Sequence, residues 1–261
     1  MSLRKVIAAS VFSLIPVMAS CSKENEPSPM PPQVPSAKFP SDPAAPSAQV
    51  SGAQGKGTIT GKVVFKGKHA AAKLSVSKDK EVCGNTKADP AVTIASDGGL
   101  KNAVVQIAGL REGKTPVKEA ELDQVKCEYV PHVLVIPTGA TLKIKNDDGI
   151  LHNVHTVSKQ NTPFNRAQPK FLKEISETFG KPEIVQMRCD VHGWMSGWVV
   201  VTDNAFYDVS RADGGFRLDG VLAGKYNLEI WHEVFGKATQ EIELKAGEVV
   251  NVTFEFHAKA N

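Results

Sequence analysis

One short segment, from Cys189 to Met195, constrains the fold of this chain more than any other part of its sequence. It spaces a thiol, an imidazole and a thioether evenly, at Cys189, His192 and Met195. Largely apolar runs precede it at 183–188 and follow it at 198–201, and short runs of this kind are typical of buried strands. We therefore expect two adjacent strands joined by a tight loop, whose three donor side chains point toward one centre.

A second imidazole lies upstream, at His152, just after the turn-forming sequence Asn-Asp-Asp-Gly at 146–149. Two His, one Cys and a weak Met form the ligand set of a blue-copper site, because thiolate and thioether are soft donors and imidazole suits either oxidation state. Each residue alone is more often a packing residue, as a lone Cys behaves like a small buried hydrophobe. Together they favour one mononuclear copper site.

These residues resemble the ligand motifs of the cupredoxins, in the amicyanin-like and plastocyanin-like branch of that family. The resemblance rests on the Cys-x-x-His-x-x-Met loop and the upstream His-Asn-Val-His segment, and it spans roughly residues 125–202. It implies a Greek-key β-sandwich in which His152, Cys189 and His192 are the strong copper ligands and Met195 is the long axial one. It further implies that Asn153 ties the ligand loop to the upstream strand, and that His192 lies nearest the surface.

The segments on either side of 125–202 carry a second β pattern. Asp-Gly-Gly-Phe-Arg-Leu and Gly-Lys-Tyr-Asn-Leu occur within 213–228, and strand–turn–strand at this spacing is typical of a sandwich. The series resembles the carboxypeptidase regulatory-like (transthyretin-like) domain, whose opening strands would be 59–65 and 102–107.

The predicted fold class is therefore all-β. A cupredoxin-like Greek-key sandwich at 125–202 is inserted in, or fused to, a second small Ig/transthyretin-like sandwich made of 57–124 and 203–257. The alternative is one enlarged, continuous β-body.

The N-terminal residues 1–20 have the features of an export signal: two basic residues, an apolar run at 6–17 and then small residues. The run is too short to span a membrane comfortably. The sequence Val-Met-Ala-Ser-Cys resembles a bacterial lipoprotein signal, which implies lipidation of Cys21 and an outer-membrane location; the alternative is an ordinary signal peptide. Residues 21–56 are rich in Pro, Ser and Ala, so we predict a disordered tether.

The chain has 4 cysteines. With Cys21 assigned to a lipid and Cys189 to the metal, Cys83 and Cys127 remain. In an oxidising compartment these two can form a disulfide, and the alternative is a pair of buried thiols.

Composition and the remaining motifs limit the other functions. The formal net charge is +3 with scattered basic residues, which does not favour nucleic-acid binding. No serine–histidine–aspartate set or carboxylate pair has catalytic spacing, so we do not expect an enzyme. His132, His155 and His232 would form either a second metal site or satisfied polar side chains where two domains meet.

The sequence thus predicts an exported, lipid-anchored protein of the cell envelope or periplasm that holds one type 1 copper. Its function would be to carry single electrons between redox partners, such as a cytochrome and a dehydrogenase or oxidase. Two alternatives stay open: an envelope protein that binds or delivers copper, and a non-redox binding or adhesion module.

Overall fold

The structure is a computed structural model that describes residues 49–50, 55–114 and 116–258. These residues form 19 strands and 1 short helix, so the predicted all-β class is confirmed. The predicted signal peptide, Cys21 and most of the tether lie outside the described residues. Within the described part of the chain, no helix has the length and apolar character needed to cross a membrane.

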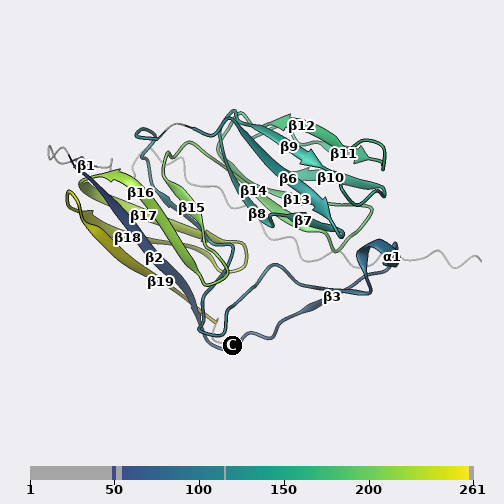
Figure 1. The fold of residues 1–261 in the computed structure, drawn as a ribbon, viewed down its shortest axis with the longest axis horizontal. Coiled ribbons are helices and arrows are strands. Elements are labelled where there is room, and N and C mark those ends of the chain that lie inside the picture. The colour runs from purple at the N-terminus through teal and green to yellow at the C-terminus, as the bar shows by residue number, and fades with distance from the viewer. Residues whose placement is uncertain (1–48, 51–54, 115, 259–261) are drawn as a thin grey trace, which may run out of the picture.

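The first body joins strands that are far apart in the sequence (Figure 1). One of its sheets has the order β1-β17-β5-β15, with β18 paired to β17, and the other has the order β16-β2-β19. Their bounds are β1 Gln49–Val50, β2 Lys56–Lys66, β5 Val104–Ile107, β15 Tyr207–Val209, β16 Gly215–Leu222, β17 Gly224–His232, β18 Gly236–Leu244 and β19 Val249–His257. Alternation explains this packing: Val252, Phe254 and Phe256 of β19 are buried between exposed neighbours.

The second body lies beside the first and is also a pair of sheets (Figure 1). The sheet orders are β11-β10-β13-β14-β8 and β12-β9-β6-β7. Their bounds are β6 Glu119–Val125, β7 Glu128–Val130, β8 Val133–Pro137, β9 Thr141–Lys145, β10 His152–Val157, β11 Asn165–Gln168, β12 Glu174–Thr178, β13 Glu183–Arg188 and β14 Ser196–Thr202. As the alternation in β9 predicts, Leu142 and Ile144 are buried in the core between the sheets.

The continuous apolar run in β14 reflects burial on both of its faces. Val199 and Val201 enter the core of the second body, whereas Trp198 and Val200 face the first body. There the Trp198 and Trp231 rings meet edge to face, with centroids 5.4 Å apart. The two bodies therefore share an apolar seam.

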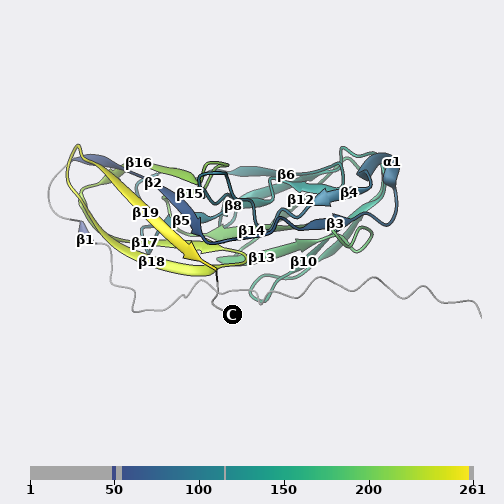
Figure 2. The same ribbon diagram turned by 90° about the horizontal axis from the view of Figure 1, so that it is seen from below.

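A loop that leaves β2 runs along the second body to its far end (Figure 2). We call its residues 73–88 the arm; they comprise β3 Lys73–Ser75, α1 Lys80–Cys83 and β4 Thr86–Ala88. A disulfide between Cys83 and Cys127 fastens the arm to the β6–β7 turn. The predicted domains meet between residues 124 and 125. In the structure, β6 lies before this point but pairs with β9 of the second body, and the arm packs against that body too.

Candidate metal centre

The segment 189–195 connects β13 to β14, which pair antiparallel up to Arg188 and Ser196. Two backbone hydrogen bonds hold the loop in a tight turn. The Cys189 amide donates to the Met195 carbonyl at 3.3 Å, and the Met195 amide donates to the His192 carbonyl at 2.8 Å. The sheet register fixes where this loop begins and ends, so its side chains have little freedom.

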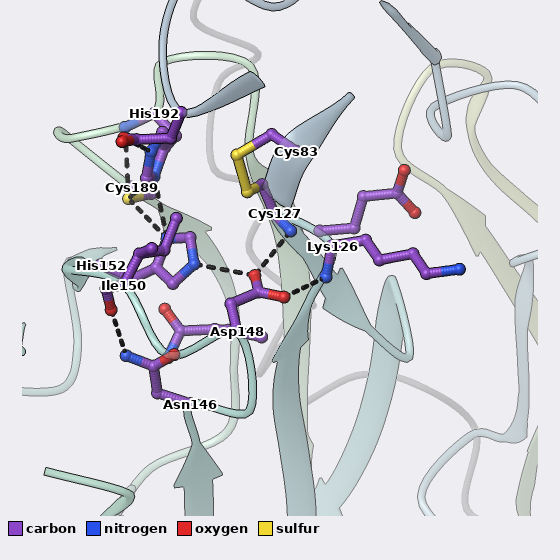
Figure 3. Close-up of polar contacts among 12 residues, drawn as sticks. Cys83, Lys126, Cys127, Asn146, Asp148, Ile150, His152, Cys189 and His192 are labelled. Carbon is purple, nitrogen blue, oxygen red and sulfur yellow. Dashed lines mark hydrogen bonds and ion pairs between the residues drawn. A yellow bond between two sulfur atoms is a disulfide. The ribbon is translucent and has the colours of Figure 1, made fainter. Parts of the chain in front are cut away.

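The structure brings Cys189, His152 and His192 together at the end of the second body (Figure 3). Cys189 Sγ lies 3.9 Å from His152 Nδ1 and 3.8 Å from His192 Nδ1, and the two Nδ1 atoms are 2.9 Å apart. His152 and His192 have no exposed surface, and Cys189 and Met195 are each 2% exposed. Three strong donors therefore face one another in a site closed to water.

The size of this triangle fits a metal ion. A point equidistant from three atoms so spaced lies about 2.1 Å from each, close to the roughly 2.0–2.1 Å and 2.3 Å bonds that imidazole nitrogen and thiolate sulfur make to zinc. One thiolate and two imidazoles in a trigonal arrangement, with a Met nearby, are the donor set of blue-copper sites. The residues present thus fit a single copper ion.

Asp148 orients His152 from the side opposite the triangle. His152 Nε2 is 2.9 Å from Asp148 Oδ2, and the Cys127 amide donates to that same carboxyl oxygen at 2.7 Å. The Lys126 amide donates to its other oxygen (Figure 3). Burial acts to lower the pKa of His152, but hydrogen bonds to Asp148 and Cys189 outweigh it and raise that pKa to about 9.

His192 is held in the same way, by a carboxylate that comes from the arm. Its Nε2 lies 2.8 Å from Asp79 Oδ2, and the Trp194 ring lies beside it at a centroid distance of 5.0 Å. Both imidazoles are fully buried, so His192 has no exposed edge. Asp79 of the arm and the Trp194 ring both lie against this ligand.

Asn153 ties the ligand loop to β10. Its Oδ1 accepts hydrogen bonds from the amides of Asp190 at 2.7 Å and Val191 at 3.1 Å, and lies 3.4 Å from Cys189 Sγ. Its Nδ2 donates to Asn165 Oδ1 at 2.6 Å. These contacts fix the start of the loop, so the sulfur is positioned before any metal arrives.

The thiol of Cys189 is tuned toward its metal-binding form. Burial acts to raise its pKa, but hydrogen bonds with His152 and His192 outweigh burial and lower that pKa to about 6. The thiolate is the nucleophile and the metal ligand. At neutral pH this cysteine is therefore prepared to bind a soft cation.

The other histidines do not form a second cluster. His132 pairs with Glu233 and with the Ser196 carbonyl at 3.1 Å. His155 contacts Asp190 at 3.0 Å, and His232 accepts from the Val234 amide at 3.2 Å. Among the residues the structure describes, these three histidines do not form a group that could hold a metal ion, although Glu233 and His132 both act on the charge of His232.

Sequence reasoning missed both carboxylates. Asp148 had a usable signal, since it stands four residues before His152 in a polar turn. Asp79 had none, because 113 positions separate it from His192.

Comparisons with known proteins give matches to solved structures alone. No protein-family model matches the sequence, and no curated protein does. A copper-containing nitrite reductase from Thermus scotoductus SA-01 matches at 25% identity over 34% of this chain and 25% of its own, with a TM-score of 0.29. A purple cupredoxin from Nitrosopumilus maritimus matches at 23% identity over 32% and 99%, with a TM-score of 0.27. A mutant of amicyanin matches at 24% identity over 38% and 98%, with a TM-score of 0.29.

Proposed function

We propose that this protein is a type 1 copper protein that carries single electrons between redox partners in the cell envelope. The observation that carries this proposal is the buried triangle of two imidazole Nδ1 atoms and one thiolate, whose size matches metal–ligand bonds. Copper bound there would supply one-electron chemistry by cycling between Cu(II) and Cu(I). Met195, in the same loop, would be the weak axial ligand.

The residues around the triangle support electron transfer because they keep the donors in place. Each imidazole is hydrogen-bonded through Nε2 to a carboxylate, and Asn153 fixes the loop that bears the thiolate. Donors held in this manner do not need to move when the charge of the ion changes. A site of this kind transfers an electron without large rearrangement.

Burial favours this function over copper delivery. A protein that hands copper to a partner needs a ligand that the partner can reach and displace, whereas His152, His192, Cys189 and Met195 are at most 2% exposed. Retention of the ion is therefore favoured. A non-redox binding or adhesion module would not require the buried donor set.

The remaining parts of the proposal concern the rest of the chain. We assign the first body to the carboxypeptidase regulatory-like sandwiches, supported by β2 pairing with both β16 and β19 and by β5 pairing with β17. Lipidation at Cys21 would anchor the protein at the outer membrane, with a cytochrome, dehydrogenase or oxidase as partner. The protein itself would transform no substrate.

A visible absorption spectrum tests the proposal. The purified protein receives one equivalent of Cu(II) and is then treated with ascorbate. We expect an intense blue or green thiolate-to-copper band that bleaches on reduction and returns on reoxidation. A colourless protein that retains zinc or no metal would overturn the type 1 assignment.

Replacing the thiolate provides the matched control. In Cys189→Ser the sulfur donor is lost while the backbone of the loop is kept, so the intense band should disappear. The disulfide at Cys83 and Cys127 stays intact in this variant and gives no such band. An unchanged spectrum in Cys189→Ser would place the copper elsewhere.

A further inference from the structure

Asp79 of the arm reaches the metal centre from outside the second body's own strands. Its Oδ2 lies 2.8 Å from His192 Nε2, and its backbone has a left-handed φ of 50°. Aspartate is among the few residues besides glycine that adopt this conformation. The position of Asp79 is defined by its carboxylate contact with His192 and by α1, which begins directly after it.

The two imidazoles of the centre are held symmetrically. In each, Nε2 meets a carboxylate oxygen, Asp148 for His152 and Asp79 for His192, so that Nδ1 faces the thiolate. A carboxylate on the distal nitrogen fixes the tautomer and ring orientation of a metal-binding histidine and makes it a stronger donor. Asp148 belongs to the second body, whereas Asp79 is supplied by the arm.

The disulfide links the segment that carries Asp79 to Cys127, whose backbone amide binds the Asp148 carboxylate. On the arm, the amides of Val82 and Cys83 donate to the Asp79 carbonyl at 3.0 and 2.8 Å. Across the disulfide, the Cys127 amide donates to Asp148 Oδ2 at 2.7 Å. Cys83, Cys127 and His192 also offer donor atoms within 4.8 Å of one another. The arm is therefore fastened directly beside the imidazole that it covers.

We propose that Asp79 is a positioning residue of the metal centre: its carboxylate, carried by the disulfide-fastened arm, locks His192 as a ligand and closes that edge of the site. This inference rests on the proposed metal site. It assigns the arm a role in metal retention and in setting the reduction potential. It also means that a redox partner approaches His192 across the arm and not at a bare imidazole edge.

The test compares three variants in the full protein. Asp79→Asn keeps a neutral acceptor and tolerates the left-handed backbone, whereas Asp79→Gly removes the side chain without backbone strain. Glu81→Gln removes the same charge from an exposed position on α1, two residues away, and serves as the matched control. Circular dichroism and thiol titration verify that fold and disulfide are retained.

Zinc affinity, measured by competition with a chelator, is the first readout. We expect Asp79→Gly to bind Zn(II) about 10- to 100-fold more weakly than the wild type, which is the usual effect of losing such a partner. Asp79→Asn should lie between, and Glu81→Gln should match the wild type. In the copper-loaded protein, the midpoint potential should rise in Asp79→Asn relative to Glu81→Gln, because a negative charge next to the ligand favours the oxidised ion.

Histidine NMR of the Zn(II)-loaded protein supplies a readout that a general loss of stability would not change. The Nε2–H proton of His192 should exchange slowly with water in the wild type and in Glu81→Gln, and rapidly in Asp79→Gly. Equal zinc affinity and equal proton exchange in Asp79→Gly and Glu81→Gln would overturn the role of Asp79 while leaving the metal site standing. A wild-type protein that binds neither Zn(II) nor Cu(II) through Cys189 would overturn both.

Discussion

Each donor side chain at the centre makes a second contact that decides where its donor atom points. Asp148 and Asp79 turn the two imidazoles so that Nδ1 faces inward. Cys189 Sγ accepts a hydrogen bond from the His192 amide at 3.4 Å and lies beside Asn153 Oδ1. Buried polar atoms need such partners, because an unpaired one costs about 1–3 kcal/mol. These contacts thus hold the three donor atoms toward one centre.

At the residue scale, Asn153→Ala tests whether the Asn153 side chain braces the ligand loop. The change leaves the amides of Asp190 and Val191 without their acceptor, so the free energy of unfolding of the metal-free protein should fall by roughly 1–3 kcal/mol. Urea unfolding followed by tryptophan fluorescence measures it. Asn251→Ala, at an exposed position of β19, should change stability by less than about 0.5 kcal/mol. Equal effects in the two variants would contradict the bracing role of Asn153.

At the scale of elements, two strands and the arm assemble the site. β13 and β14 are central in their sheet and buried on both faces, so the loop between them starts from a rigid base. The arm has little core of its own: of its residues, Val76 and Cys83 are the buried ones. A covalent bond to Cys127 compensates for this small buried surface and keeps the arm against the second body.

Removal of the disulfide tests the element scale. Cys83→Ala/Cys127→Ala opens a loop with a sequence separation of 44, for which the chain-entropy model gives a loss of about 4 kcal/mol in the free energy of unfolding. Urea unfolding of the metal-free protein measures this loss. Adding a reductant should destabilise the wild type and leave the double variant unchanged. If the wild type showed no response to full reduction, the arm would not depend on the bond.

At the scale of the whole molecule, the two bodies meet through a seam that combines apolar and polar contacts. Trp198 packs against Trp231 and donates through Nε1 to Glu233 at 2.8 Å, and Glu233 also pairs with His132. Next to this seam lies His232, stacked on Phe235 at 4.9 Å and without exposed surface. The seam thus couples the sheet that carries Cys189 to the first body.

His232 makes global stability depend on pH. Burial lowers its pKa from 6.5 to about 4 despite the nearby Glu233 carboxylate. Above pH 6.5 the folded and unfolded states are both neutral at this residue; between pH 6.5 and about 4 the unfolded chain alone takes up the proton. The free energy of unfolding should therefore fall as pH drops through this window, by roughly 3 kcal/mol in all.

Urea unfolding of the metal-free protein at several pH values from 7 to about 4 checks this. His232→Phe keeps an aromatic ring in the stack and removes the titrating group, so its stability should decline less over the same window. Both proteins should still lose stability at lower pH, because buried carboxylates such as Glu183 then take up protons. Burial acts to raise the pKa of Glu183, but its hydrogen bonds outweigh burial and lower that pKa. Parallel curves for the two proteins would show that His232 is not responsible.

The local pattern of residues in the sequence determined which segments form strands and which side chains offer donor atoms. The apolar run at 198–201 predicted a buried strand, which the structure shows as part of β14. The alternation in β9 puts Leu142 and Ile144 on one face, because a strand's side chains alternate between its faces whatever lies around it. The Cys-x-x-His-x-x-Met spacing predicted a tight loop of donors, because such a loop is too short to disperse them.

Contacts between distant segments were decided by the tertiary structure alone. Neither the reach of Asp79 to His192 across 113 positions nor the burial of His192 beneath the arm has a local signal. The pairing of Ala120 and Leu122 of β6 with β9 is another such contact, and the sequence of β6 gives no sign of it. Sequence periodicity reports which face of an element is buried, but only the folded chain determines which other segment covers it.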